Sequence, residues 1–275
     1  MKGKTVLITG ATDGIGKRTA IELAKMGARV IIHGRNNVHG EETLAEIESI
    51  NGNGSVSYEN ADLASLSQVK KLAGSVMQSH EKLDVLINNA GVFTRGQLFS
   101  TDGYEMTFAV NHLAHFALSL QLLPLLKKAE QGRIITVSSV AHTNSPRIDF
   151  DDIQEINTYI DYSAYALSKL ANVLFSIELS ERLKGTAVTS NSLHPGVITT
   201  KLLYEGFGIS GSSVDKGCRT SVHLASHGSL SATTGKYFSE SKQAEPSAFS
   251  YDPGARRNLW ELSEDVTGVC FDDIK

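Results

Sequence analysis

The chain starts with a predicted buried strand that runs directly into a glycine-rich turn and then a helix. The run of β-branched and aliphatic residues at 6–8 carries no charge, which is typical of a strand buried on both faces. Gly10, Gly14 and Gly16 follow, and residues 17–26 favour a helix. Such a turn lets backbone N–H groups and a helix N-terminus approach a phosphate without an intervening Cβ. Its Gly-x3-Gly-x-Gly spacing differs from the usual dinucleotide fingerprint, so the turn alone indicates either a phosphate site or a tight structural connection.

Strand and helix patterns alternate along all 275 residues without a repeat, a low-complexity segment or a linker. This alternation predicts a single doubly wound α/β domain over residues 1–275, with helices on both faces of a parallel, Rossmann-like sheet of about seven strands. Predicted strands lie at 4–8, 28–33, 55–60, 83–87, 133–137, 187–192 and 235–238. Predicted helices lie at 17–26, 36–50 (ended by the glycine-rich 51–54), 65–80, 101–128 (stopped or kinked near Pro124) and 165–183, with a short one from 215 and a terminal one through 262.

The bulk composition excludes several classes of protein. A net charge of −4 and a pI near 6.1 argue against non-specific nucleic-acid binding, which needs a basic face. The two cysteines, Cys218 and Cys270, lie far apart and outside any metal pattern, as expected in a reducing compartment. The first strand begins too early for a signal peptide, and the most apolar stretch, 112–126, is interrupted by polar residues and is expected to be too short to span a bilayer. We therefore expect a cytoplasmic protein without a transmembrane anchor.

Three further stretches accompany the glycine turn in a fixed order. Residues 88–91 read Asn-Asn-Ala-Gly after one predicted strand, Ser138 and Ser139 end another, and Tyr165 and Lys169 stand near the start of a helix. Together these motifs resemble the short-chain dehydrogenase/reductase family, and the resemblance covers nearly the whole chain. Within that family, the segments 110–116, 137–142, 168–175 and 194–197 are most similar to the retinol-dehydrogenase-like branch.

Tyr165 and Lys169 are four residues apart, so on a helix they lie on one face and can reach one small group together. A phenol has a pKa near 10 in water, and a nearby ammonium group lowers it toward the working range. Such a tyrosine can act as general acid in carbonyl reduction and as general base in alcohol oxidation. Taken alone, the pair is equally a helical tyrosine beside a solvated lysine; the family resemblance favours the catalytic interpretation.

The resemblance implies two further catalytic residues. Ser139 is expected to hydrogen-bond the substrate oxygen, while its competitor Ser138 is expected to bond backbone at the strand end. Asn111 is expected to hold Lys169 through water in a proton relay, although a buried asparagine in mid-helix can instead satisfy a local backbone group.

Cofactor contacts also follow from the resemblance. The glycine turn should line the pyrophosphate, 62–63 should flank the adenine, Asn89 should lie on the adenosine side, and 195–199 should meet the nicotinamide end. Asp62 could equally be the N-cap of the following helix. The full expected set is Gly10, Thr12, Asp13, Gly14, Ile15, Gly16, Arg35, Asn36, Asp62, Leu63, Asn89, Ala90, Gly91, Asn111, Tyr165, Lys169, Pro195, Gly196, Val197 and Thr199.

The end of the second predicted strand indicates which cofactor is used. A site that prefers NAD usually places an acid there to hold the ribose 2′-hydroxyl, whereas this chain has His33, Gly34, Arg35 and Asn36. Arg35 is placed to hold a 2′-phosphate, which predicts NADP(H) as cofactor, unless it is a solvent-facing loop arginine. Some NADP(H) relatives also carry a basic residue where this chain has Asp13.

The histidines do not predict a metal site. The spacings of His112, His115, His142 and His194 match no metal motif, and Ser139 has no Gly-x-Ser-x-Gly setting for a hydrolase. We expect buried or loop histidines.

The sequence therefore predicts an NADP(H)-dependent oxidoreductase that transfers hydride between nicotinamide and a carbonyl or alcohol substrate; the resemblance implies that this small molecule is apolar. The alternative is an NADP(H)-binding regulatory or scaffold protein. The intact set of four catalytic residues disfavours it, because a protein that only binds the cofactor does not need all four groups. The substrate pocket should be walled by 94–98, 143–161 and 200–213, the last a mobile glycine- and serine-rich lid. Family members often form homodimers through the helices that would carry Asn111 and Tyr165.

Overall fold

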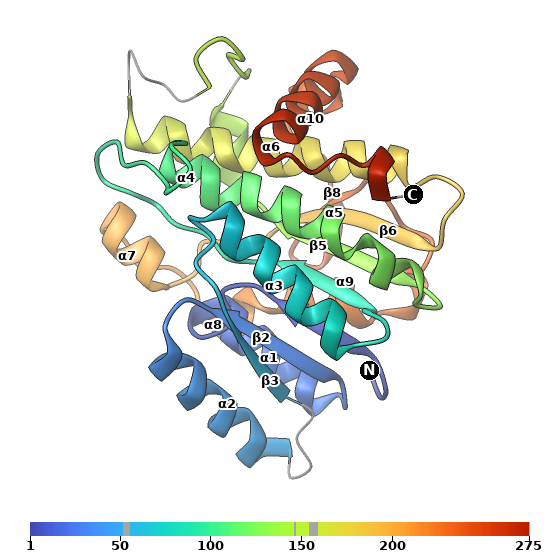
Figure 1. Cartoon of the computed structure of the whole chain (residues 1–275). Coiled ribbons are helices and arrows are strands. Elements are labelled where there is room, and N and C mark those ends of the chain that lie inside the picture. Colours follow the sequence, from blue (N-terminus) through green and yellow to red (C-terminus); the bar gives the residue numbers. More distant parts are fainter. Residues whose placement is uncertain (52–55, 146, 154–158, 275) are drawn as a thin grey trace.

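The computed structural model describes residues 1–51, 56–145, 147–153 and 159–274. These residues form an eight-stranded sheet with helices on both faces (Figure 1). Its strand order is β3-β2-β1-β4-β5-β6-β7-β8, and every neighbouring pair is parallel except the last. The predicted doubly wound, Rossmann-like fold is thereby confirmed. The strands are β1 (Thr5–Ile8), β2 (Arg29–Gly34), β3 (Val56–Asn60), β4 (Val85–Asn88), β5 (Gly132–Val137), β6 (Val188–His194), β7 (Tyr237–Ser239) and β8 (Lys242–Ala244).

The strand register arranges the core in two rows. Ile8 lies beside Ile32 of β2 and Ile87 of β4, and Ile87 lies beside Ile135 of β5. Because successive side chains of a strand point to opposite faces, the neighbouring positions form a second row on the other face. That second row consists of Leu7, Ile31, Leu86 and Ile134, all fully buried.

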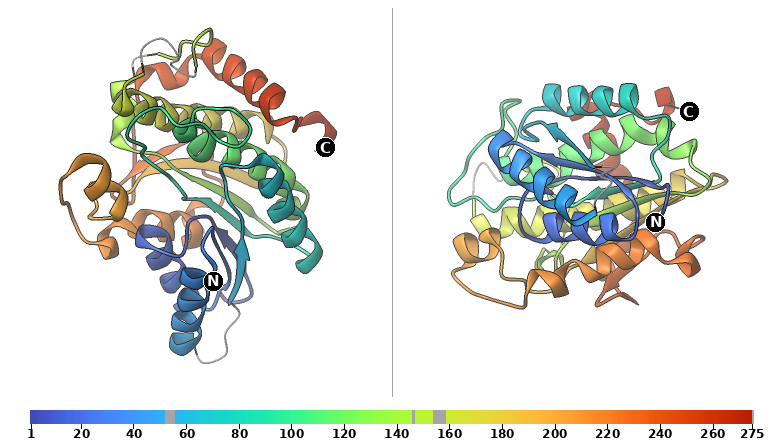
Figure 2. Two further views of the ribbon diagram at one scale, coloured as in Figure 1. Left: turned by 60° about the vertical axis from the view of Figure 1, so that its left-hand side comes forward. Right: turned by 90° about the horizontal axis from the view of Figure 1, so that it is seen from below.

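One layer of helices covers each row (Figure 2). The helices are α1 (Gly14–Lys25), α2 (Asn37–Asn51), α3 (Leu66–Ser79), α4 (Met106–Phe108), α5 (Ala114–Lys127), α6 (Asp161–Arg182), α7 (Lys201–Phe207), α8 (Val214–Gly217), α9 (Arg219–Ser226) and α10 (Pro253–Thr267). The Ile8 row packs against α1, α2 and α9, and the Leu7 row packs against α3, α5 and α6. Helix α10 covers α6 from outside, with Trp260 fully buried.

Strand β8 is one strand more than predicted. It pairs antiparallel with β7 after a two-residue turn at Glu240 and Ser241, both of which have positive φ values, 50° and 61°. The strand has only three residues and is mostly exposed, so it leaves no buried apolar run in the sequence.

The predicted helix at 101–128 starts later than expected and runs through its proline. Helix α4, a π-helical turn at Ala109–Leu113 and α5 form one continuous helix, Met106–Lys127, which contains Pro124. In the part of the chain that the structure describes, it is the one helix long and apolar enough to cross a membrane. With 22 residues the helix is long enough to span a bilayer, so the expectation that this apolar stretch is too short was wrong. Of its most apolar 18 residues, 89% are buried inside the fold.

The predicted loop at 200–213 contains a helix, so that prediction was wrong in part. Helix α7 begins after Thr200, whose hydroxyl accepts a hydrogen bond from the backbone N–H of Leu203 at 3.2 Å, and ends at Gly208 with φ of 66°. None of its seven residues is fully buried, so no apolar periodicity marks it in the sequence. The predicted helix end at 52–54 lies outside the described residues, as do 146 and 154–158 of the predicted pocket wall.

Several histidine rings are buried in this fold. His112 is 1% exposed and packs against the rings of Phe108 and Phe175, and its Nε2 lies 2.9 Å from the hydroxyl of Ser263. Burial disfavours the charged imidazolium and lowers the pKa of His112 to about 3. The same effect lowers the pKa of His33, at the end of β2, to about 4.

These pKa values predict that acid destabilises the protein well above pH 4. Unfolded histidines titrate near pH 6.5, so below that pH the unfolded chain binds more protons and the free energy of unfolding falls. For His112 alone, the loss between pH 7 and pH 5 is about 2 kcal/mol. Urea unfolding at both pH values measures it. A His112→Phe variant has no such group, so its loss should be about 2 kcal/mol smaller; equal losses in the two proteins would contradict the neutral buried ring.

Candidate active site

The glycine turn is held where β1 and β4 end side by side, at the point where the strand order reverses. The hydroxyl of Thr9 accepts hydrogen bonds from the backbone N–H groups of Asn89 and Ala90, at 2.9 and 3.0 Å. In return, the Asn89 amide donates to the carbonyl oxygens of Thr9 and Gly10, at 2.8 and 3.2 Å. A Cβ at Gly16 would lie 2.2 Å from the Gly10 oxygen and 2.4 Å from the Asn89 amide, so α1 reaches this position only with glycine. Ligands of open α/β sheets bind at this kind of reversal.

The turn adjoins the end of β2. The side chain of Thr12 lies against Gly34, where an added Cβ would be 2.5 Å from Thr12 Cγ2. Asp13 caps α1, and its carboxylate accepts the N–H of Gly14 at 2.7 Å, while Ile15 follows in the first turn. The exposed Arg35 comes directly after Gly34, so its side chain starts beside the glycine turn.

Two of the expected cofactor residues have local structural partners. Asn36 accepts the backbone N–H of His39 at 3.1 Å, at the start of α2. Asp62 accepts the N–H of Ala64 at 3.0 Å, within the turn between β3 and α3. Ser65 is the residue that precedes α3, so the alternative reading of Asp62 as that helix's N-cap was wrong. Leu63, beside Asp62, is buried.

Tyr165 and Lys169 lie together on α6, facing the carboxyl end of β5. Both are almost fully buried, at 7% and 3% exposure. The Lys169 ammonium donates to the carbonyl oxygen of Val137 at 3.2 Å and lies 5.6 Å from the centre of the Tyr165 ring. Ser139 lies near enough to Tyr165 to act on the pKa of its hydroxyl. The structure thus brings the predicted tyrosine, lysine and serine to one point.

Burial dominates the pKa values of this group. It raises the pKa of Tyr165 to about 12, although Ser139 acts in the opposite direction. Burial also lowers the pKa of Lys169 to about 8, because the charged ammonium loses its hydration. The expectation that the lysine lowers the tyrosine pKa toward neutrality was therefore wrong for the protein alone. Tyr165 carries its proton at neutral pH, as a general acid requires.

The two neighbouring serines have different partners. Ser138 is 2% exposed and donates its hydroxyl proton to the carbonyl oxygen of Lys169 at 2.7 Å, which supports the backbone of α6. Ser139 is half-buried, accepts the N–H of Ala141 at 3.2 Å and acts on the pKa of Tyr165. Only Ser139 is therefore placed beside the tyrosine hydroxyl.

Asn111 lies in the π-helical turn and holds the segment after β4. Its side-chain oxygen accepts the N–H of Val92 at 2.8 Å, and its amide donates to the Val92 carbonyl and the Ser168 hydroxyl, both at 3.0 Å. These bonds match the alternative reading, in which the side chain satisfies backbone groups. Lys169 is nevertheless close, because a Cβ at Gly91 would lie 3.3 Å from the Lys169 nitrogen and 3.4 Å from the Asn111 oxygen.

The segment after β6 forms the base of a protruding loop. Val197 accepts the N–H of Ser212, and Thr199 bonds both Ser212 and Gly211, at 2.8 to 3.0 Å. These bonds join 197–199 to 211–212, a pairing called the neck below, and so close residues 200–210 into a loop. Gly196, with φ of 98°, and Pro195 precede the neck at the end of β6.

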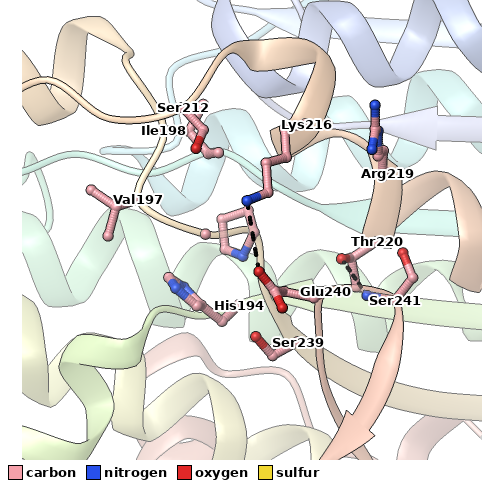
Figure 3. A pocket seen from close by; sticks show the side chains of 12 residues that line it. His194, Val197, Ile198, Ser212, Lys216, Arg219, Thr220, Ser239, Glu240 and Ser241 are labelled. Atoms are coloured by element: carbon pink, nitrogen blue, oxygen red, sulfur yellow. Dashed lines mark hydrogen bonds and ion pairs between the residues drawn. The ribbon is translucent and has the colours of Figure 1, made fainter.

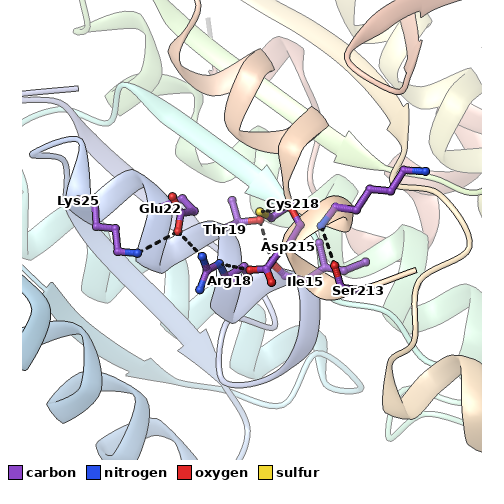
Figure 4. A network of polar contacts seen from close by, with 9 residues as sticks. Ile15, Arg18, Thr19, Glu22, Lys25, Ser213, Asp215 and Cys218 are labelled. Atoms are coloured by element: carbon purple, nitrogen blue, oxygen red, sulfur yellow. Dashed lines mark hydrogen bonds and ion pairs between the residues drawn. The ribbon is translucent and has the colours of Figure 1, made fainter. Parts of the chain in front are cut away.

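The segment that follows this loop is anchored to α1. Arg18 bonds Glu22 of its own helix at 2.8 Å and Asp215 of α8 at 2.7 Å (Figure 4). A cavity of about 410 Å³ lies between the neck, α8–α9 and the end of β7 (Figure 3). Lys216 and Glu240 form an ion pair across it at 3.7 Å, and neither Tyr165 nor Ser139 lines it.

Sequence reasoning missed several residues that shape the site. His33 accepts the N–H of Gly10 at 3.3 Å and bonds the Ala61 carbonyl at 3.0 Å, so it links the glycine turn to the end of β3. Phe93 packs on the Tyr165 ring with a centroid distance of 5.7 Å, and so does Phe207, at 5.6 Å, from the predicted pocket wall 200–213. These partners are distant from one another in the sequence. The sequence therefore shows which residues are aromatic, but not that they pack together. Among the described residues, no group of three or more His, Cys, Asp or Glu side chains could hold a metal ion.

Comparison with known proteins identifies the family. Residues 4–206 match the family model described as short chain dehydrogenase. Human retinol dehydrogenase 14 is 38% identical, covering 98% of this chain and 88% of the relative. Human retinol dehydrogenase 13 is 40% identical, covering 97% and 85%. A solved structure of an uncharacterized protein from Mycobacterium paratuberculosis is 34% identical with a TM-score of 0.83, covering 98% of this chain and 95% of that one.

The chain therefore belongs to the short-chain dehydrogenase family, whose members are oxidoreductases. Its similarity to retinol dehydrogenases over nearly its whole length confirms the predicted resemblance to the retinol-dehydrogenase-like branch.

The different partners of the two serines predict different losses of activity. Ser139→Ala removes the hydroxyl beside Tyr165, so turnover should fall by roughly 10- to 100-fold, the effect of one lost bond to the reacting oxygen. Ser138→Ala removes a support of the α6 backbone, so it should lower the melting temperature and change turnover by less than about threefold. Steady-state kinetics and thermal unfolding of both variants provide the test. Equal losses of turnover, or the reverse order, would contradict the assignment.

Proposed function

We propose that this protein is an NADP(H)-dependent oxidoreductase that transfers hydride between nicotinamide and the carbon of a carbonyl or alcohol group. The observation that carries the proposal is the meeting of Tyr165, Lys169 and Ser139 at the carboxyl end of β5. The resemblance of the glycine turn to the pyrophosphate site of the family supports the same reaction. We propose no separate binding function, because a protein that only binds the cofactor has no need of a buried tyrosine, lysine and serine together.

The residues present fit a dinucleotide. A Cβ added at Gly14 would lie 3.4 Å from the Thr200 methyl group, so the glycine turn faces the base of the loop after β6. A bound dinucleotide would then extend from Arg35 and Asp62 past the turn to residues 195–199. When bound, the cofactor supplies or accepts the hydride.

The protein's own residues then handle the substrate oxygen. Tyr165, protonated at neutral pH, donates its proton to the oxygen when a carbonyl is reduced. The Ser139 hydroxyl orients the same oxygen, and the Lys169 ammonium stabilises the phenolate that remains. Asn111 fixes the backbone at Val92 beside this group.

The choice of NADP(H) rests on Arg35. Gly34 ends β2 where an acid would repel a 2′-phosphate, and the exposed guanidinium next to it offers charge-assisted hydrogen bonds. Arg35 takes part in none of the ion pairs that link the residues described by the structure. Its charge is therefore available to a phosphate.

The aromatic surroundings of Tyr165 support an apolar substrate. The rings of Phe93 and Phe207 both pack on the Tyr165 ring, and their own centroids are 4.6 Å apart. The Tyr162 ring lies beside that of Phe207, with a centroid distance of 6.0 Å. Two of the similar proteins are retinol dehydrogenases, and retinol is an apolar alcohol. We extend this class, rather than that one compound, to the chain.

The loop 200–210 serves as the lid over this site. Phe207 at its tip covers Tyr165, while its neck is fixed by Thr199. A Cβ at Gly206 would lie 2.9 Å from the Phe93 ring, so α7 packs this closely only with glycine there. Amide hydrogen exchange of residues 200–210 should slow when NADPH and a carbonyl substrate are both present; unchanged exchange at saturation would refute the lid.

The proposed cofactor choice predicts a selective effect of Arg35→Ala. A hydrogen bond to a charged group contributes about 1.5–3 kcal/mol, so NADPH should bind roughly 10- to 150-fold more weakly. NADH, which lacks the 2′-phosphate, should bind almost unchanged. Dissociation constants of both cofactors at one fixed salt concentration measure this, with Arg29→Ala, at the opposite end of β2, as matched control.

Two outcomes would contradict the proposal. If the unmodified protein prefers NADH, or if Arg35→Ala weakens both cofactors equally, Arg35 does not bind the 2′-phosphate. If no aldehyde, ketone or quinone in a broad panel is reduced at the expense of NADPH, the proposed reaction itself fails.

A further inference from the structure

His115 connects two parts of the proposed site that are distant in sequence. It lies in the first turn of α5, fully buried, four residues after Asn111. Its Nδ1 is 3.0 Å from the Asn111 carbonyl oxygen, and its Nε2 is 2.9 Å from the Thr9 hydroxyl. One imidazole ring therefore joins the helix of Asn111 to the end of β1.

The hydrogen-bond network fixes the protonation of this ring. The Thr9 oxygen already accepts the N–H groups of Asn89 and Ala90, at 2.9 and 3.0 Å, so its remaining capacity is to donate its own proton. The closest acceptor for that proton is Nε2 of His115, since the alternative, the Ile87 carbonyl, is 3.4 Å away. Nε2 is then unprotonated, and Nδ1 carries the hydrogen and donates it to Asn111.

These contacts form a closed ring around residues 89–92. Thr9 holds the N–H groups at 89 and 90, and the Asn111 side chain holds both backbone groups of Val92. His115 closes the ring by linking Thr9 to Asn111. The enclosed segment contains Gly91, beside which both the Lys169 nitrogen and the Asn111 side-chain oxygen lie.

His115 supports Asn111 where the backbone departs from regular α-helical geometry. Asn111 lies in the π-helical turn Ala109–Leu113, in which hydrogen bonds skip one residue further than in an α-helix. Such a turn departs from the regular α-helical bonding of α5, and the His115 side chain supplies a donor to the Asn111 carbonyl. A turn of this kind is frequently found at functional sites.

We propose that His115 is a positioning residue for the reaction: it keeps the cofactor-binding segment 89–91 and the Asn111–Lys169 pair at a fixed spacing. The inference rests on the proposed function. Its action passes through Thr9 and Asn111, and the ring itself touches neither substrate nor cofactor.

His115→Phe tests this role, because phenylalanine keeps a ring of similar size and removes both hydrogen bonds. The dissociation constant for NADPH should rise roughly 10-fold and kcat should fall roughly 10- to 100-fold, the effect of unpaired buried groups at Thr9 and Asn111. The KM for the carbonyl substrate should stay within about twofold, since the substrate pocket is not altered. His112→Phe is the matched control, since His112 lies on the same helix but packs in the aromatic core.

Two further variants separate positioning from a general loss of stability. His115→Asn keeps a donor near the Nδ1 position, so it should recover part of kcat. Thr9→Val combined with His115→Phe should cost little more than the larger single change, because both break the same ring. If His115→Phe fails to fold, His115→Asn carries the test, with the same measurements of NADPH binding and kcat. The nitrogen-15 NMR signals of the unmodified imidazole should show a proton on Nδ1 only, whether or not the protein is active.

Three results would overturn the inference. If His115→Phe and His112→Phe both lower only the stability of the protein and affect NADPH binding and kcat equally, His115 has no positioning role. Fully additive effects of the Thr9 and His115 changes show that no shared ring exists, and a proton on Nε2 contradicts the network directly. If the unmodified protein neither binds NADPH nor reduces any carbonyl, the proposed function fails, and the positioning role in the reaction fails with it. The proton on Nδ1 is expected even then, so the two failures are distinguishable.

Discussion

The structure depends on the close approach of β1 and β4 at their carboxyl ends. Thr9 and Asn89 exchange hydrogen bonds across this junction, and Gly16 lets the start of α1 come within contact of Gly10 and Asn89. The junction is also where the strand order reverses, which opens a crevice at the edge of a doubly wound sheet. A side chain larger than hydrogen at Gly16 would push α1 away from the strands, and with it the turn proposed to hold the cofactor phosphates.

A second constraint is the burial of charge and proton donors along α6. Lys169 is nearly inaccessible to water, and its ammonium group donates to the Val137 carbonyl. Tyr165 is buried beside it under Phe93 and Phe207. Desolvation makes the neutral form of each more stable, which is why the pKa of the tyrosine rises and that of the lysine falls. In the free protein Tyr165 is therefore protonated at neutral pH, the form from which a general acid starts. Its raised pKa also makes it a weaker acid, so donation requires a neighbouring positive charge that stabilises the phenolate.

Much of the fold could be predicted from sequence, because its central strands are uninterrupted apolar runs between glycine or polar turns. The same holds for residues 88–91, Ser139, Tyr165 and Lys169, because their types and order match the motifs of the family. Strand β8 and helix α7 could not be found in this way, since each is short and exposed.

Contacts between distant residues were also invisible to sequence reasoning. His115 and Thr9 are 106 positions apart, and nothing in either stretch indicates that they meet. The desolvation of Tyr165 likewise depends on Phe207, which comes from a segment that sequence alone describes as a loop. The residue types of the site were predictable, but their electrostatic environment required the packing.

The central claim is that Tyr165 exchanges the proton with the substrate oxygen, and Tyr165→Phe tests it most directly. The measurement compares kcat with a reducible carbonyl and the dissociation constant for NADPH, with Tyr162→Phe, an exposed tyrosine of the same helix, as control. General acid catalysis contributes roughly 10²- to 10⁴-fold, so turnover should fall at least about 100-fold while NADPH binding is retained. Near-normal turnover by Tyr165→Phe on a good substrate would contradict the account.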